Sequence, residues 1–237
     1  MMRENEVNYN EYPFSILAIR NLKRLEFKSN VTFFVGENGS GKSTILEAIA
    51  YQCGFNTAGG SKNNTYEVDA SQSGLGDHIR LSWMPKITNG FFLRAETFYH
   101  FASHLDTMPE SLRNYGGRSL HEQSHGEAFL SLFNNRFGKK AIYLLDEPEA
   151  ALSPARQLAL LRIIKDLGDE AQFIIATHSP ILLGYPDAQI LNFDDHPIAE
   201  TRYEDTLHYI ITRRFLENRE KVLDEIFTDS DPEDEDD

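Results

Sequence analysis

The sequence predicts an α/β fold, in which a mixed β-sheet is flanked by helices on its faces. Three observations predict it. A glycine-rich loop at 36–43 lies between an apolar strand pattern and a helical pattern. Two further runs, 141–145 and 172–176, are short and continuously apolar, as in strands buried within parallel sheets. Strand and helix patterns alternate after the loop, which is typical of α/β domains.

The first half of the chain is expected to contain five strands and two helices. Apolar alternation indicates short strands, and a run of apolar residues at helical spacing indicates a helix. The strands are predicted at 14–20, 25–27, 31–35, 78–83 and 91–94, and the helices from the loop to about 52–54 and at 96–105.

The second half has clearer punctuation. Ser153 is the predicted N-cap of a helix that has Pro154 in its first turn and ends at Gly168. A helix before it and an amphipathic helix near the C-terminus are predicted from apolar spacing. These elements are a helix at 125–137, strands at 141–145, 172–176 and 188–193, and a closing helix at 206–218.

Composition limits the class of protein. The 237 residues carry a net charge of −14, and Cys53 is the single cysteine, so no internal disulfide can form. No apolar run approaches the length of a membrane span, so we expect a cytoplasmic protein without membrane insertion. Seven of the acidic residues lie between Asp229 and Asp237. We expect one domain at 1–227, with a helical part at about 96–137, and a disordered acidic tail at 228–237.

The loop at 36–43 fits the pattern G-x-x-x-x-G-K-[ST] of a phosphate-binding P-loop. Its glycines allow backbone N–H groups and the next helix N-terminus to point at phosphate oxygens. Lys42 is expected to reach the β- and γ-phosphates, and Ser43 to ligate Mg²⁺. A chance glycine-rich turn is disfavoured by the strand and helix on its flanks. The predicted phosphate-binding residues are Gly36, Glu37, Asn38, Gly39, Ser40, Gly41, Lys42, Ser43 and Thr44.

Two apolar strands deliver polar residues to their carboxyl ends. Asp146 and Glu147 follow the run at 141–145, so Asp146 is expected beside Ser43 as a magnesium ligand. Glu147 is then placed to orient the attacking water. His178 follows the run at 172–176, where it is expected to contact the γ-phosphate.

The stretch from His121 to Glu127 has three competing interpretations. Ser124 and Glu127 form a capping box that opens the helix at 125–137. The letters His121-Glu122-Gln123-Ser124-His125 also match the zinc motif H-E-x-x-H, with Glu147 available as a third ligand. The third interpretation is a nucleotide-sensing loop, in which Ser124 and the Gly126 amide face a γ-phosphate across a dimer interface. A helix that begins within the motif disfavours zinc.

The order GENGSGKS, SHGE, YLLDEPEAALS and THS resembles the ABC-type ATPases. It is most similar to the branch with RecF-like, structural-maintenance-of-chromosomes-like and overcoming-lysogenisation-defect-like proteins. The resemblance implies a head-to-tail homodimer that closes on two ATP molecules and reopens on hydrolysis. Each ATP would lie between Lys42 of one subunit and Ser124, Gly126 and Glu127 of the other.

Three positions depart from the family pattern. His125 stands where the signature usually has glycine, and Ser153 stands where an aspartate is common. Glu96 is the available substitute for the glutamine that would approach the metal.

The leading hypothesis is therefore an ATP- and Mg²⁺-dependent ATPase. It would act as a dimeric switch or clamp on a separate effector protein or a nucleic acid. The alternatives are the nucleotide-binding subunit of a transporter and a zinc hydrolase.

Overall fold

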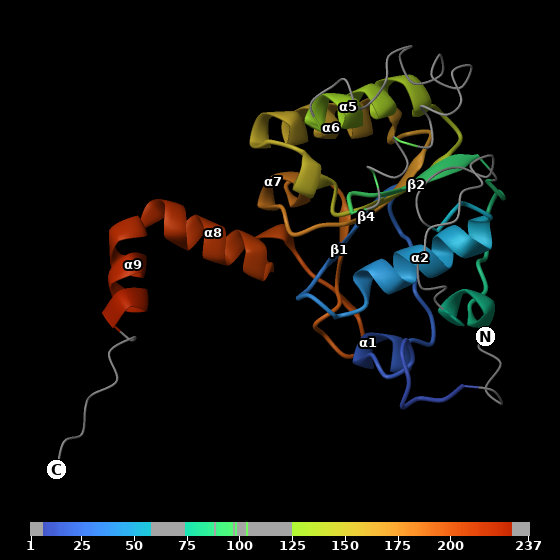
Figure 1. Cartoon of the computed structure of the whole chain (residues 1–237), viewed down its shortest axis with the longest axis horizontal. Coiled ribbons are helices and arrows are strands. Elements are labelled where there is room, and N and C mark those ends of the chain that lie inside the picture. The colour runs from blue at the N-terminus through green and yellow to red at the C-terminus, as the bar shows by residue number, and fades with distance from the viewer. Residues whose placement is uncertain are drawn as a thin grey trace.

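The computed structural model describes residues 7–57, 74–87, 89–96, 98, 103 and 125–228. A six-stranded sheet in the order β2-β3-β4-β1-β5-β6 forms its centre (Figure 1). The strands are β1 (Val31–Val35), β2 (Gly90–Arg94), β3 (Ile142–Asp146), β4 (Gln172–Ala176), β5 (Gln189–Asn192) and β6 (Ala199–Glu200). The first five run parallel, and β6 pairs antiparallel with β5. The predicted mixed sheet is confirmed.

Helices cover both faces of this sheet. One face carries α1 and α2, and the other carries α5, α6 and α7, because each set shares a hydrophobic cluster with alternate strand residues. The helices are α1 (Leu17–Arg20), α2 (Lys42–Cys53), α5 (His125–Arg136), α6 (Pro154–Leu167), α7 (Pro180–Leu183), α8 (Leu207–Glu217) and α9 (Arg219–Thr228). Short 3₁₀ turns are η2 (Gly74–His78), η5 (Pro148–Ala151) and η6 (Tyr203–Asp205).

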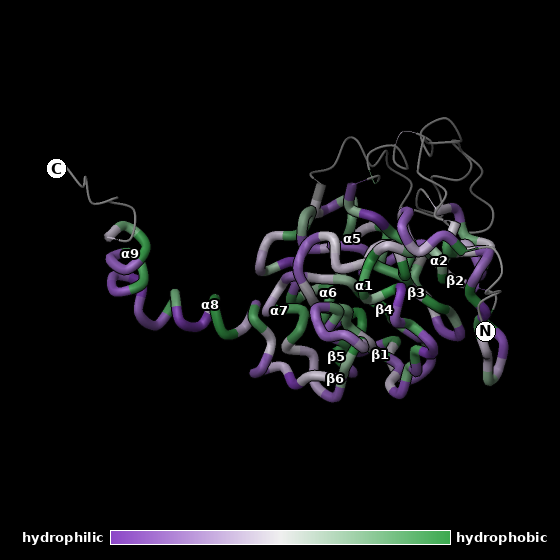
Figure 2. Tube along the Cα trace, turned by 90° about the horizontal axis from the view of Figure 1, so that it is seen from below, coloured by the Kyte–Doolittle hydropathy of each residue, from purple (hydrophilic) through white to green (hydrophobic). Residues whose placement is uncertain are grey.

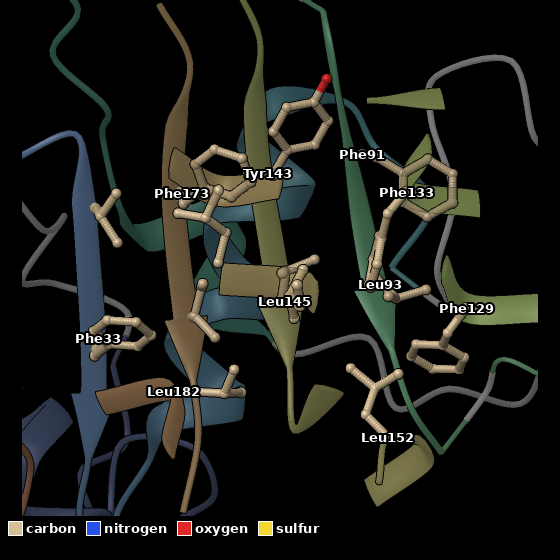
Figure 3. Close-up of a cluster of buried hydrophobic side chains, with 14 of the residues drawn as sticks. Phe33, Phe91, Leu93, Phe129, Phe133, Tyr143, Leu145, Leu152, Phe173 and Leu182 are labelled. Carbon is tan, nitrogen blue, oxygen red and sulfur yellow. The ribbon is translucent and has the colours of Figure 1, made fainter. Parts of the chain in front are cut away.

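The sheet is apolar on both faces, which is why its strands are continuous hydrophobic runs. Phe33 belongs to the cluster under α5 and α6, whereas its neighbour Phe34 belongs to the cluster under α2. Figure 3 shows the first cluster, to which α5 contributes Phe129 and Phe133 and β2 contributes Phe91 and Leu93. This packing fixes the carboxyl ends of the parallel strands along one edge.

Most elements predicted after the loop are present, but the strands predicted at 14–20 and 25–27 are not. Residues 14–20 form a turn and α1, since Arg20 N and Asn21 N donate to carbonyls four residues back. No strand is present at 25–27 or 78–83 within the described chain. The apolar residues of these two segments pack against the α2-side cluster, namely Leu25, Phe27, Ile79, Leu81 and Trp83. Because only one side of each segment is buried, apolar and polar residues alternate although no β-ladder forms. The helix predicted at 96–105 lies mostly outside the described residues.

The last two helices form an arm, residues 207–228, that projects from the body (Figures 1 and 2). The closing helix predicted at 206–218 corresponds to α8, and α9 was not predicted. Both helices lie within the described residues, and none of their residues is buried. An ion pair between Arg214 and Glu225 links them. The exposed apolar side chains of the arm are Leu207, Ile210, Ile211, Phe215, Leu216, Ile226 and Phe227.

The boundaries expected from the sequence extend beyond the described ranges. The domain at 1–227, its helical part at 96–137 and the acidic tail at 228–237 therefore stay predictions. Each helix in the described part of the chain is too short or too polar to cross a bilayer.

Candidate nucleotide-binding site

The glycine-rich loop turns directly from β1 into α2. Gly36 has a φ of 140° and Gly41 a φ of 103°, backbone conformations that favour glycine. A Cβ at Gly36 would also lie 2.9 Å from Asp194 Oδ1. Gly41 is the N-cap of α2 and has no side chain with which to occupy the first amides of this 12-residue helix. Those amides and the helix dipole make the start of α2 suited to an anion.

Lys42 holds a positive charge at the centre of the loop. Its side chain is buried, and Nζ donates to Gly36 O at 2.7 Å and to Glu37 O at 2.9 Å. Burial lowers the pKa of Lys42, and the nearby carboxylates of Glu147 and Asp194 oppose that shift. The ammonium therefore lies inside the turn where phosphate oxygens are expected to bind.

Asp146 and Ser43 meet as the sequence predicts. Ser43 Oγ donates to Asp146 Oδ1 at 2.9 Å, and Asp146 is the last residue of β3. Burial raises the pKa of Asp146 to about 6, while Arg94 and the Ser43 hydrogen bond act in the opposite direction. A hydroxyl beside a carboxylate matches the oxygen ligands that Mg²⁺ uses together with substrate phosphates. Among the described residues, no group of three or more His, Cys, Asp or Glu side chains is arranged to hold a metal. A Mg²⁺ bound here would take its remaining ligands from phosphate and water oxygens.

Arg94 adds a cation that sequence reasoning missed. It ends β2 opposite Asp146, with Nε 3.6 Å from Asp146 Oδ2 and Nη1 3.6 Å from Glu47 Oε2. Glu47 lies on α2 and is buried. The sequence does contain one indication of this role, because Arg94 is the polar residue that ends the apolar run at 91–94.

Glu96 lies on the outer side of Arg94. Its side chain is 81% exposed, and Oε2 accepts from Arg94 Nη2 at 3.3 Å. Glu96 is thus linked to Asp146 through the guanidinium of Arg94. Its predicted position as a metal ligand stays a prediction.

Glu147 and His178 come together at the neighbouring strand ends. Glu147 has a φ of 50°, and its N–H donates to Ala176 O at 2.9 Å. This turn places Glu147 Oε1 3.8 Å from His178 Nε2. The backbone N–H of His178 donates to Glu149 Oε1 at 2.6 Å, which ties the segment after β4 to the segment after β3. Burial raises the pKa of Glu149, and this hydrogen bond opposes the shift.

A second histidine approaches the same place from α8. His208 Nε2 lies 2.8 Å from His178 Nδ1, and the ring centroids are 4.9 Å apart. Burial lowers the pKa of His208. Sequence reasoning did not include His208, because the return of α8 to the sheet edge is a tertiary contact without a local motif.

A cavity of about 240 Å³ opens beside the loop. Tyr12 forms part of its wall, and its hydroxyl lies 3.2 Å from Thr44 Oγ1. Tyr12 also was missed, since it comes from the N-terminal segment and no phosphate motif includes it. The lining residues are Tyr12, Ile16, Asn38, Gly39, Gly41, Lys42, Ser43, Thr44 and Glu147.

Buried polar atoms without a hydrogen-bond partner gather here. In the described part of the chain these atoms are Ser40 Oγ, Arg94 Nε, Glu149 Oε2 and His178 Nε2. Ser40 belongs to the loop, and the other three lie at or just beyond the carboxyl ends of β2, β3 and β4. Buried polar groups are normally paired, so such a cluster fits a site that takes a polar ligand. A triphosphate with Mg²⁺ has the oxygens that this site can use.

The predicted signature segment is only partly described. Ser124 and the other residues at 121–124 lie outside the described residues, and so do the capping box and the zinc motif that depend on them. Gly126 is buried at the start of α5, where a Cβ would overlap the guanidinium of Arg156. Arg156 also lies 3.6 Å from Glu127 Oε1. The cross-dimer roles of Ser124, Gly126 and Glu127 stay predictions.

Comparison with protein families gives two matches. Residues 13–91 match a family described as "AAA domain", and residues 128–184 match one described as "AAA domain, putative AbiEii toxin, Type IV TA system". The first covers the loop and the second covers Asp146, Glu147 and His178. The "SMC head domain from Thermotoga maritima" is similar at 19% identity, over 75% of this chain and 92% of that one, with a TM-score of 0.42.

Two curated relatives match at higher identity. The "DNA replication and repair protein RecF" of Chlorobaculum parvum is 34% identical over 110 residues, which are 40% of this chain. The chain spans under a third, 29%, of the length of that relative. The "Probable branched-chain amino acid transport ATP-binding protein LivF" of Archaeoglobus fulgidus is 30% identical over 169 residues, 62% of this chain and 69% of that protein. The chain belongs to the ABC-type family of P-loop ATPases.

Proposed function

We propose that this chain hydrolyses ATP and that two copies close head to tail around two Mg-ATP molecules. The observation that carries the proposal is the convergence of the loop lysine and two pairs of side chains at the carboxyl ends of the parallel strands. Lys42 lies within the loop, Ser43 donates to Asp146, and Glu147 faces His178. Membership of the ABC-type family supports the same activity.

Each side chain has a distinct task in this proposal. Lys42 and the amides at the start of α2 bind the β- and γ-phosphates, and Ser43 and Asp146 hold Mg²⁺. The metal, when bound, would neutralise charge on the phosphate oxygens. Glu147 orients the attacking water, and His178 donates to the γ-phosphate. The polar atoms of Ser40 and His178 that have no partner among the described residues would gain one on nucleotide binding.

Closure of two copies would complete the site. The side chain of Glu147 is 46% exposed, so a nucleotide at this loop would keep a solvent-facing side. The start of α5 in a second copy could cover it, with Ser124, Gly126 and Glu127 near the γ-phosphate. Loss of that phosphate removes the charge that both faces bind, which would reopen the pair.

The closed pair would act on a separate effector protein or on a nucleic acid. The RecF relatives carry a name that refers to DNA replication and repair, but the match covers 29% of their length. The chain as a whole is strongly acidic, with a net charge of −14. This charge disfavours a broad phosphate-binding surface, so a nucleic-acid partner would need a local basic face.

A second candidate function is the ATP-binding subunit of a transporter. The match to the LivF protein over 69% of its length favours it. In that case the chain would bind a separate membrane protein. Purification of the chain from membranes together with such a partner would support this candidate over the clamp.

The decisive variant is Glu147→Gln. It should bind ATP, hydrolyse it very slowly and accumulate as a dimer, because the water is no longer oriented while the phosphate contacts remain. Light scattering after size exclusion, with and without Mg-ATP, measures this. Glu170→Gln, an exposed carboxylate paired with Lys139, is the matched control and should hydrolyse normally.

Two further variants separate binding from pairing. Lys42→Ala should lose ATP binding, and Ser124→Arg should bind ATP without forming the dimer. If Glu147→Gln binds Mg-ATP and remains monomeric, the clamp is wrong. If the wild-type chain does not bind ATP, the whole proposal fails.

A further inference from the structure

We propose that His208 is a positioning residue, which fixes the ring of His178 with its proton on the nitrogen that faces the phosphate site. The geometric part of this inference stands on the contacts alone. Its consequence for hydrolysis rests on the proposed function of His178.

Both ring nitrogens of His178 have a defined neighbour. Nδ1 lies 2.8 Å from Nε2 of His208, and Nε2 lies 3.8 Å from Oε1 of Glu147. His178 Nε2 is buried and has no hydrogen-bond partner among the described residues. Nδ1 of the ring thus contacts His208 of α8, and Nε2 faces Glu147.

The acceptor character of a carboxylate decides where the proton lies. An ionised glutamate only accepts hydrogen bonds, so Nε2 of His178 is favoured as an N–H donor toward Glu147. A neutral imidazole has one N–H, and Nδ1 of His178 must then accept. His208 therefore donates from Nε2, as a neutral ring in the matching tautomer. The γ-phosphate needs the same arrangement, because it too is an acceptor.

The surroundings of His208 favour the neutral ring. Burial lowers its pKa, and the positive charge of Lys42 acts in the same direction. The carboxylates of Glu37 and Asp194 oppose them. At neutral pH His208 therefore has one proton, which it can donate to His178.

The first turn of α8 is fixed to the segment that follows His178. Tyr203 Oη donates to Pro180 O at 3.0 Å, and Thr206 Oγ1 donates to Tyr203 O at 2.8 Å. Thr206, which is buried, also caps α8 by accepting from Tyr209 N at 3.4 Å. These bonds hold the start of α8, and with it His208, next to the segment that follows β4.

Beyond this first turn, the described residues of the arm lie at the surface. None of the residues of α8 and α9 is buried, and both helices are described throughout. A groove of about 940 Å³ separates part of α8 from the body, lined among others by His178, Glu149, Tyr209 and Arg213. The orientation of His178 thus depends on the position of a helix that is fixed at its first turn.

Three substitutions at 208 test the donor directly. The amide nitrogen of glutamine occupies nearly the position of histidine Nε2, so His208→Gln keeps the donor, whereas His208→Asn is too short and His208→Leu has none. In the leucine and asparagine variants kcat should fall about 10–100-fold, the loss typical for an outer-shell partner, with little change in KM for ATP. His208→Gln should keep a kcat close to that of wild type, because it keeps the donor. Ile211→Ala, an exposed change on the same helix, is the control.

The ring proton can be observed without hydrolysis. Two-bond ¹⁵N–¹H spectra of protein labelled with ¹⁵N-histidine should show His178 protonated at Nε2 in wild type and in His208→Gln. In His208→Leu the His178 signals should shift toward a mixture of tautomers. Protonation of His178 at Nδ1 in wild type would overturn the proposal, whether or not the variant proteins fold.

Failure of this inference differs from failure of the proposed function. If His178→Ala hydrolyses ATP at the wild-type rate, His178 has no role in hydrolysis, and the spectra alone test the ring contact. If His178→Ala is slow and His208→Leu is as fast as wild type, His208 does not position His178.

Discussion

Ser43 Oγ and Asp146 Oδ1 are joined by a 2.9 Å hydrogen bond, although 103 residues separate them in the sequence. Ser43 reaches this point from the second residue of α2, and Asp146 from the end of β3. Strand β4 lies between β1 and β3, so the pair bridges across one strand of the sheet. Parallel pairing aligns the strand ends, and this alignment brings the Ser43 hydroxyl and the Asp146 carboxylate together.

The first prediction concerns this pair. Ser43→Ala and Asp146→Asn should each raise the Mg²⁺ concentration needed for hydrolysis by more than the ~10–100-fold that loss of an outer-shell partner costs. The reason is that each removes an oxygen proposed to bind the metal itself. A Mg²⁺ titration of ATPase rate measures the effect, and Asp166→Asn on the exposed face of α6 serves as control. An unchanged Mg²⁺ requirement in Asp146→Asn would contradict the assignment.

The second prediction concerns the cation beside Asp146. Arg94→Leu should lower the free energy of unfolding by about 3–5 kcal/mol, because it removes the guanidinium that lies 3.6 Å from the buried carboxylates of both Glu47 and Asp146. Arg94→Lys should lose less, since it keeps a charge but not the planar group.

Urea unfolding at pH 7.5 measures this difference. Arg162→Leu is the matched control, because Arg162 pairs with Asp166 on the surface, and it should change stability by less than about 1 kcal/mol. If Arg94→Leu is as stable as Arg162→Leu, the buried carboxylates have another source of compensation.

The part of the site that the sequence predicts is the part carried by local patterns. The loop at 36–43, Asp146 and His178 each follow a buried strand, and parallel strands bring their carboxyl ends to one edge. That rule places Ser43, Asp146 and Glu147 near one another without any knowledge of side-chain packing.

The residues that sequence reasoning missed reach the site through tertiary contacts. Tyr12 arrives from the segment just before the run at 14–20, which was predicted as a strand and instead forms a turn and α1. The packing of α1 against the α2-side cluster brings this segment next to the loop. His208 arrives because hydrogen bonds of Tyr203 and Thr206 fix the start of α8. Asp194, two residues beyond the end of β5, accepts from the Glu37 N–H at 2.9 Å. None of these approaches has a fixed spacing along the chain.

The third prediction concerns Tyr12. The residue is 58% exposed at the wall of the cavity, and its hydroxyl lies 3.2 Å from Thr44 Oγ1. A nucleotide with its phosphates at the loop would have its base near this ring. Tyr12→Ala should weaken ATP binding about tenfold, within the ~1–3 kcal/mol that base stacking on an aromatic ring contributes.

Tyr12→Phe separates stacking from the hydroxyl contact. It should bind ATP almost as wild type does, whereas Tyr9→Ala, which changes an exposed ring outside the cavity lining, should have no effect. Calorimetry with a non-hydrolysable ATP analogue measures both. Equal affinities for Tyr12→Ala and wild type would exclude a stacking role.

The fourth prediction follows from the lowered pKa of His208. In the unfolded chain this ring titrates near 6.5, whereas in the folded protein it takes up its proton at lower pH. As pH falls through 6.5 the unfolded state binds the proton first, so folding loses free energy until the folded-state pKa is passed. The groups that face His208, namely His178, Lys42, Glu37 and Asp194, are present in every variant compared.

His208→Gln lacks this titration, so its free energy of unfolding should fall less than that of wild type between pH 7.5 and pH 5.5. Urea unfolding at both pH values gives the difference, and the surface variant His196→Gln should follow wild type, because His196 is exposed. If wild type and His208→Gln lose the same stability over this interval, burial does not hold His208 neutral, and its role as the donor to His178 loses its electrostatic basis.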